Sequence, residues 1–286
     1  MSEKEDSIPP HRGLKKGLYV LPTLFTAANV AMGFFAVLYS IRGFDLVKTA
    51  PEDASFYFNR AAIAIGLAIL FDTFDGRIAR ATRTATEIGV QFDSLADVLT
   101  FGIAPTALIF SWAFAPTFHE NSGAYGIGVF LLFAFLMCGA FRLARFNLQA
   151  TRPRVLMEGA VKVDKNYFVG LPIPPAGGLL AAIVHFHPMP LSTLGESAAK
   201  YYGFALMALV GILALLMVST IRYVSAKTGS KGRKGFLLVL FLAGVAMAIW
   251  LYSQYTLLIL AGAYVAHGLV LFVVRPFLVR PKLTED

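Results

Sequence analysis

The sequence has little charge and a single cysteine. Lys, Arg, Asp and Glu make up only 15% of its 286 residues, while 57% are hydrophobic and the mean hydropathy is +0.67. Soluble domains carry about 25% charged residues, so this composition excludes an ordinary soluble protein and indicates insertion into a membrane. Cys138 has no partner for an intrachain disulfide, and its place in an apolar run predicts a buried packing role.

The sequence also lacks the features of a cleavable signal peptide and of a nucleic-acid-binding protein. Residues 1–16 are polar and charged, without an early apolar stretch that ends in small residues. We therefore expect the first membrane helix to serve as the targeting signal. The net charge is +8, but basic residues of membrane proteins more often set orientation and contact anionic headgroups, so we expect no nucleic-acid partner.

Long apolar segments predict an all-α, polytopic integral membrane protein. A bilayer-spanning helix needs about 20 mostly apolar residues, and about eight such segments can be placed along the chain. They cover residues 18–41, 56–81, 92–114, 124–146, 167–187, 201–223, 235–253 and 256–277. We expect residues 1–17 to form a cytoplasmic tail and residues 18–286 a single transmembrane catalytic domain, with its core at about 20–225 and additional helices at about 235–277.

The basic residues predict the orientation of these spans. With a cytoplasmic N-terminus, only four of the 25 Lys and Arg residues fall on the outer side, namely Arg42, Lys48, Arg60 and Lys200. Cytoplasmic loops of membrane proteins carry an excess of Lys and Arg. The sequence therefore predicts a multi-pass protein of the cell (inner) membrane with both termini cytoplasmic.

Four aspartates interrupt the apolar pattern within residues 71–97. Asp72 and Asp75 are three residues apart near the end of the second span, and Asp93 and Asp97 are four residues apart near the start of the third. Helical residues at these spacings share one face. The short polar connection between the two spans predicts a helical hairpin that brings the four carboxylates together at the cytoplasmic side.

These carboxylates repel one another and are costly near a bilayer, so they need compensating charge. Mg²⁺ and Mn²⁺ take oxygen ligands, and shared carboxylates can bridge two such ions. A salt-bridge network with Arg77, Arg80 and Arg83 is the alternative. Gly76 and Gly89 favour the metal, because glycine costs roughly 1 kcal/mol in a helix relative to alanine and both lie on the acidic faces, where they leave room for a phosphate-bearing substrate.

The complete pattern resembles the signature of the CDP-alcohol phosphotransferase family. It reads Asp72-x-x-Asp75-Gly76-x-x-Ala79-Arg80, eight further residues, and then Gly89-x-x-x-Asp93-x-x-x-Asp97, with every fixed position and spacing present. The resemblance implies a metal-dependent enzyme that transfers a substituted phosphate group from a CDP-linked lipid or alcohol to a hydroxyl acceptor and releases CMP. Its cofactor would be a divalent metal, Mg²⁺ or Mn²⁺, as two ions.

The resemblance also implies roles for the acidic residues. Asp72, Asp75 and Asp93 would be metal ligands. Asp97 would lie at the same metal site and act as the general base that takes the proton of the attacking hydroxyl.

The remaining signature residues would bind the nucleotide part of the CDP-lipid. Gly76, Ala79 and Gly89 would leave room for cytidine, and Arg80 would hold an acidic residue or a phosphate in place.

Segments outside the signature resemble the phosphatidylserine synthases of the integral-membrane bacterial and archaeal type. These segments are PTLFTAANVAMGF (22–34), DSLADVLTFGIAPTA (93–107), CGAFRLARFN (138–147) and YFVGLPIPPAGG (167–178). Thr23 departs from the pattern, since relatives more often have Asn there. The resemblance implies CDP-diacylglycerol and L-serine as substrates, and it favours a homodimer. Arg142 and Arg145 share one helix face and could bind a serine carboxylate or a lipid phosphate, or act only as orientation anchors.

Two other functions stay open. Within the family, the acceptor could be glycerol 3-phosphate, an inositol phosphate or choline. Outside it, acidic residues in a polytopic protein could mark a cation or proton transporter. Against transport, the aspartates gather at one membrane face, and spans five to eight have no charged residue midway.

Overall fold

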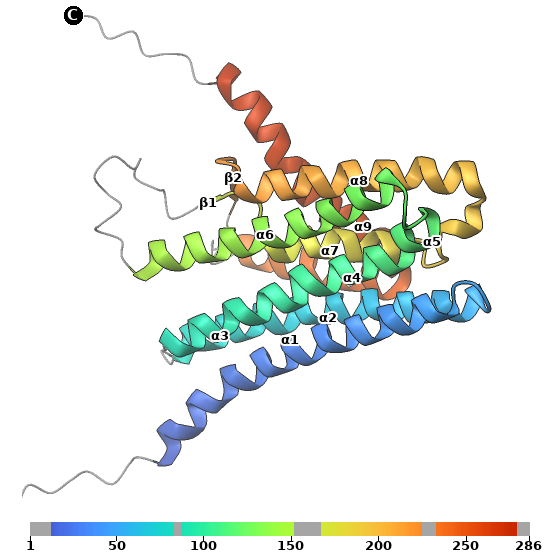
Figure 1. The fold of residues 1–286 in the computed structure, drawn as a ribbon. Helices are drawn as coiled ribbons and strands as arrows, with labels where there is room; N and C mark the ends of the chain where they lie inside the picture. Colours follow the sequence, from blue (N-terminus) through green and yellow to red (C-terminus); the bar gives the residue numbers. More distant parts are fainter. Residues whose placement is uncertain (1–12, 83–86, 152–166, 225–232, 279–286) are drawn as a thin grey trace, which may run out of the picture.

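The computed structural model describes residues 13–82, 87–151, 167–224 and 233–278, which form a bundle of long helices (Figure 1). The helices and strands of this part are α1 (Gly13–Leu46), α2 (Pro51–Thr82), α3 (Glu87–Asp97), α4 (Ala104–Ile109), α5 (Ala115–Thr117), α6 (Gly123–Thr151), β1 (Tyr167–Val169), α7 (Ile173–Phe186), α8 (Glu196–Val218), β2 (Arg222–Val224) and α9 (Arg233–Leu278). The expected all-α class is confirmed, with one short two-stranded ribbon added.

The third predicted span is the central element of the bundle. It runs from α3 through α5 as one rod that includes two π-helical segments, Val98–Ile103 and Phe110–Phe114. Helices α1 and α7 approach this rod closely. A Cβ at Gly33 of α1 would lie 2.5 Å from Thr100 Oγ1, and one at Gly177 of α7 would lie 2.7 Å from the carbonyl oxygen of Phe101. The first π-helical segment is thus held on two sides immediately after Asp97.

Six helices of the described chain are long and apolar enough to cross a membrane. They lie within α1, α2, the α3–α5 rod, α6, α8 and α9, while α7 is a shorter apolar helix of 14 residues. Within α9, Tyr252 has non-helical backbone angles (φ −139°, ψ 51°), and it lies near the expected boundary between the seventh and eighth spans. The predicted count of eight is not confirmed and stays a prediction.

The first four expected spans are shorter than the observed helices, whereas the fifth and sixth include residues that are not helical. The fifth was expected to begin at residue 167, but α7 begins at Ile173 because Pro172 has extended backbone angles (φ −61°, ψ 145°). The sixth was expected to reach residue 223, but α8 ends at Val218, where Ser219 turns extended (φ −62°, ψ 165°). The excluded residues form the antiparallel ribbon, in which Phe168 pairs with Tyr223.

Cys138 lies on α6 and is partly buried against the hydrophobic core. Its expected packing role agrees with this position, although the side chain is not fully enclosed.

Candidate active site

The four aspartates come together where α2 ends and α3 begins. Carboxylate oxygens of Asp72, Asp75 and Asp93 lie within 4.8 Å of one another. Asp97 extends the group, because its carboxylate interacts electrostatically with those of Asp72, Asp93 and Asp75. Both aspartate pairs occupy helix faces that turn toward each other, as the three- and four-residue spacings predict.

The chemistry of this group fits a divalent cation. All the donor atoms are carboxylate oxygens, which Mg²⁺ and Mn²⁺ prefer. Asp75 and Asp97 are only 4% and 7% exposed, and Oδ1 of Asp97 is buried without a hydrogen-bond partner among the described residues. Buried carboxylates are unfavourable unless their negative charge is compensated. A bound cation would compensate this charge and would give the unpaired oxygen a ligand role.

The alternative salt-bridge network can be examined only for Arg77. Its side chain is exposed, and it forms no ion pair with another described residue. Arg80 is part of α2 by its backbone, but its side chain lies outside the described residues, and Arg83 lies outside them entirely. Arg77 therefore does not neutralise the aspartates in this structure.

Helix α1 contributes a side chain that the sequence did not single out. The hydroxyl of Thr26 donates a hydrogen bond to Oδ2 of Asp75 over 3.0 Å, and both side chains are buried. Hydrogen bonds to metal-binding carboxylates orient them and tune their affinity. Thr26 lies within the segment at residues 22–34, which is therefore part of the site's support.

Asn29, one turn beyond Thr26 on α1, is another buried polar residue beside the rod. Its carbonyl oxygen accepts a hydrogen bond from the hydroxyl of Thr100 over 3.2 Å. Its side chain is 0% exposed, and neither polar atom has a hydrogen-bond partner within the described residues. The contact with Thr100 places α1 against the π-helical segment that follows Asp97.

Arg142 is an arginine of α6 that is linked to the aspartates. Arg142 is 7% exposed and interacts electrostatically with Asp97 and with Arg145. One residue pair anchors this end of α6: the side-chain amide of Asn147 donates a hydrogen bond of 2.8 Å to the hydroxyl of Ser94 on α3. The structure thus brings Arg142 to the aspartate cluster, which ordinary membrane anchoring does not require.

Arg145 faces the segment that follows strand β1. Gly170 has a positive φ of 80°, which favours glycine, and a Cβ built there would lie 3.3 Å from Nη2 of Arg145. The amide of Gly170 donates to the carbonyl oxygen of Ile221 over 2.8 Å. The glycine of the GLPIPP segment therefore allows the chain to pass close to Arg145.

The residues expected at the nucleotide are only partly described. Gly76 is half-buried on α2 and Gly89 is exposed on α3, both close in sequence to the aspartates. The side chains of Ala79 and Arg80 lie outside the described residues. Nucleotide contacts at these four positions stay predictions.

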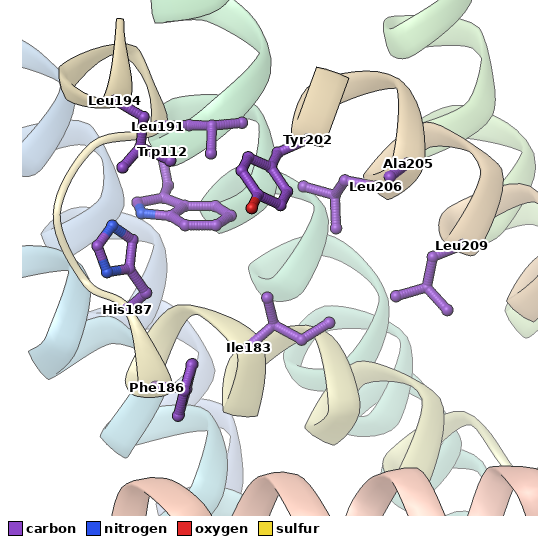
Figure 2. Close-up of a pocket in the computed structure, with 10 residues that line it drawn as sticks. All are labelled: Trp112, Ile183, Phe186, His187, Leu191, Leu194, Tyr202, Ala205, Leu206 and Leu209. Atoms are coloured by element: carbon purple, nitrogen blue, oxygen red, sulfur yellow. The ribbon is translucent and has the colours of Figure 1, made fainter. Parts of the chain in front are cut away.

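A separate cavity of about 470 Å³ is lined by residues of the second π-helical segment, α7 and α8 (Figure 2). Most of its lining is apolar, and its aromatic and polar members include Trp112, His187 and Tyr202. The indole nitrogen of Trp112 donates to the carbonyl oxygen of Met189 over 2.6 Å. Trp112 lies 15 residues along the rod from Asp97, or about 22 Å at 1.5 Å per helical residue, so this cavity is distinct from the aspartate site.

Comparison with known proteins gives matches over most of the chain. A family model described as CDP-alcohol phosphatidyltransferase matches residues 19–204. A Helicobacter pylori (strain J99) protein named CDP-diacylglycerol--serine O-phosphatidyltransferase is 30% identical over 253 residues, which is 88% of this chain and 91% of the relative.

Relatives from other kingdoms match shorter parts. A Saccharomyces cerevisiae protein with the same name is 32% identical over 183 residues, covering 64% of this chain and 59% of its own length. A Methanothermobacter thermautotrophicus protein named archaetidylserine synthase is 31% identical over 205 residues, covering 71% of this chain and 69% of its own length. The residues matched by the family model include all four aspartates and both arginines of α6.

Proposed function

The chain belongs to the CDP-alcohol phosphatidyltransferase family, and on that premise we propose that it transfers the phosphatidyl group of CDP-diacylglycerol to the hydroxyl of L-serine, giving phosphatidylserine and CMP. The convergence of Asp72, Asp75, Asp93 and Asp97 is the observation that carries the proposal. The Helicobacter relative supports serine as the acceptor, because its similarity extends over nearly the full length of both chains.

Asp72, Asp75 and Asp93 would hold the divalent metal, Mg²⁺ or Mn²⁺, with Asp97 at the same site and two ions as the expected number. Metal bound there would neutralise the phosphate oxygens and the departing CMP. Thr26 would keep Asp75 in its binding orientation through their hydrogen bond.

Asp97 would take the proton of the acceptor hydroxyl as the oxygen attacks the lipid-side phosphorus. A serine hydroxyl is a poor nucleophile at neutral pH, so a carboxylate within hydrogen-bond reach accelerates the attack. The phosphorus–oxygen bond to CMP breaks as the bond to serine forms. Arg142 and Arg145 would bind the serine carboxylate, because guanidinium groups suit carboxylates and Arg142 already interacts with Asp97.

Gly76, Ala79, Arg80 and Gly89 would surround the nucleotide, with the acyl chains of the lipid in the bilayer. The basic residues support a cytoplasmic active site in the cell (inner) membrane, where a soluble acceptor and CMP can enter and leave. Residues 18–286 would form one catalytic domain. Small-residue helix faces favour a homodimer.

A panel of acceptors tests the proposal. Purified protein is incubated with CDP-diacylglycerol, Mn²⁺ or Mg²⁺, and one acceptor at a time: serine, glycerol 3-phosphate, an inositol phosphate or choline. The lipid product is then identified by mass spectrometry. Phosphatidylserine as the main product supports the proposal, and a different main product replaces serine as the acceptor. Cation uptake into vesicles without any CMP release would favour a transporter instead.

A further inference from the structure

Tyr223 of the ribbon joins the second half of α9 to the rest of the bundle. Its side chain is fully buried, and its ring stacks on that of Tyr264, with 5.8 Å between the ring centroids and 26° between the planes. Gly268 lies one turn beyond Tyr264 on the same face of α9, and a Cβ there would overlap the Tyr223 ring. Tyr223 therefore occupies a notch between Tyr264 and Gly268.

Tyr264, which the stack fixes, also interacts electrostatically with Arg142 of the candidate active site. Arg142 interacts electrostatically with both Tyr264 and Asp97, so one guanidinium connects α9 with the carboxylate proposed as general base. Tyr223 and Tyr264 both lie beyond residues 19–204, the part of the chain that the family model matches. The part of the chain that follows the family-model match therefore contributes a residue that interacts with Arg142.

Two donors in this cluster are buried without a partner. Within the described part of the chain, neither Nε of Arg142 nor the hydroxyl of Tyr223 has a hydrogen-bond partner. Burial raises the pKa of Tyr223 to about 12, so its hydroxyl keeps its proton at neutral pH. An unsatisfied buried donor is unfavourable, and a charged one more so. Arg142 therefore offers a positive charge and an unpaired N–H to an anionic group, whereas the Tyr223 hydroxyl is enclosed against Gly268.

We propose that Tyr264 is a binding residue for the anionic group of the acceptor, which it holds together with Arg142, and that Tyr223 is a positioning residue that fixes Tyr264. The inference rests on the proposed function, since the acceptor is serine and the anionic group its carboxylate. The Tyr264 hydroxyl donates one directed hydrogen bond beside the guanidinium, which distinguishes a carboxylate-bearing acceptor from a cationic one such as choline.

Substitution of Tyr264 by phenylalanine tests this role with little disturbance of the fold. Tyr264→Phe keeps the ring and its stack on Tyr223 but removes the hydroxyl. We expect the KM for serine to rise about tenfold or more, as for the loss of a hydrogen bond to a charged group, while kcat and the KM for CDP-diacylglycerol stay within about twofold. Tyr255→Phe is the matched control, because Tyr255 lies on the same helix and is exposed, and it leaves all three constants unchanged.

Tyr223→Leu tests the positioning role. Loss of the stack is expected to raise the KM for serine in the same way, and the double variant with Tyr264→Phe is expected to be no worse than the more impaired single variant, because both changes remove one interaction. Additive effects, or a Tyr223→Leu variant in which the KM for CDP-diacylglycerol rises equally, would overturn the positioning role.

The outcome for Tyr264 separates this inference from the proposed function. An unchanged KM for serine in Tyr264→Phe overturns the inference while serine remains the acceptor. If the wild-type protein prefers a phosphate-bearing acceptor, such as glycerol 3-phosphate, to serine, the proposed acceptor is wrong. A raised KM of the Tyr264→Phe variant for that phosphate-bearing acceptor still supports the anion-binding role of Tyr264. Preference for choline overturns both.

Discussion

Asp75 depends on a hydroxyl from a different helix, the Thr26 side chain of α1. Thr26→Ala removes this hydrogen bond and with it one of the contacts that orient Asp75. We expect the affinity for Mn²⁺ to fall about 10- to 100-fold, as for other residues that orient metal ligands. Electron paramagnetic resonance of free Mn²⁺ during a titration measures this affinity directly, without reference to turnover.

Thr26→Ser is the matched control, because it keeps the hydroxyl and removes only a methyl group. Its Mn²⁺ affinity is expected to stay close to that of the wild type. Equal loss in both variants would show that packing of the threonine methyl group matters and that the hydrogen bond to Asp75 does not.

Asp97 is the residue to which the proton transfer is assigned. Asp97→Asn keeps the size and a carbonyl oxygen of the side chain but cannot accept the hydroxyl proton. We expect kcat to fall by a factor of about 10²–10⁴, with binding of CDP-diacylglycerol largely retained. Initial rates of CMP release and equilibrium binding of the CDP-lipid measure the two quantities separately. Full turnover in this variant would contradict the assignment of Asp97 as base.

The residues of the site differ in how far the sequence could predict them. The aspartates were predictable, because a helix converts spacings of three and four residues into one face. The hydrogen bond of Thr26 and the stack of Tyr223 on Tyr264 were not, because these contacts join helices and strands far apart in the sequence. A threonine or tyrosine in an apolar segment has no local pattern that separates a site residue from ordinary packing.

At the scale of helices, the α3–α5 rod depends on the close approach of α7. A Cβ at Gly177 would lie 2.7 Å from the Phe101 carbonyl oxygen and 3.0 Å from Cγ of Pro105, and the carbonyl belongs to backbone that cannot rotate away. We expect Gly177→Ala to destabilise the protein by about 1–3 kcal/mol, the usual range for overpacking. Thermal unfolding of the detergent-solubilised protein measures the change.

Gly66→Ala on α2 is the control for this prediction, since no atom lies within 4 Å of a Cβ placed there. Alanine is the better helix former by about 1 kcal/mol, so this variant is expected to be as stable as the wild type or slightly more stable. A Gly177→Ala protein that matches it in stability would show that α7 can shift away from the rod.

The hydropathy of the sequence predicted where the helices lie along the chain, but it did not predict the polar contacts between them. The imidazole of His185 on α7 lies 2.6 Å from Oδ1 of Asn59 on α2 and 2.9 Å from the hydroxyl of Ser253 on α9. This partly buried chain of hydrogen bonds joins three helices close to the non-helical residue Tyr252. No sequence pattern connects the three residues, because polar side chains near span ends are common. The ribbon was missed for a similar reason, since each strand has only three residues.

At the scale of the whole molecule, the polar chemistry lies at one end of the bundle. The aspartates belong to the end of α2 and to α3, which lie at one end of the bundle, whereas α5 lies at the other end (Figure 1). Trp112, in the π-helical segment that immediately precedes α5 in the rod, lines the apolar cavity (Figure 2). The predicted orientation places most Lys and Arg residues on the same side of the membrane as the aspartates. This excess of basic residues supports a cytoplasmic site. This arrangement suits an enzyme whose lipid substrate stays in the bilayer while its acceptor and nucleotide product are soluble.

The central claim is that the aspartate cluster carries out metal-dependent transfer from CDP-diacylglycerol to serine. Its most direct test is the initial rate of CMP release by the purified protein, measured with and without serine, and with Mn²⁺ or Mg²⁺ either present or removed by a chelator. We predict CMP release only when serine and metal are both present, with one phosphatidylserine formed for each CMP. CMP release that does not depend on serine, or that continues after chelation, would contradict the account.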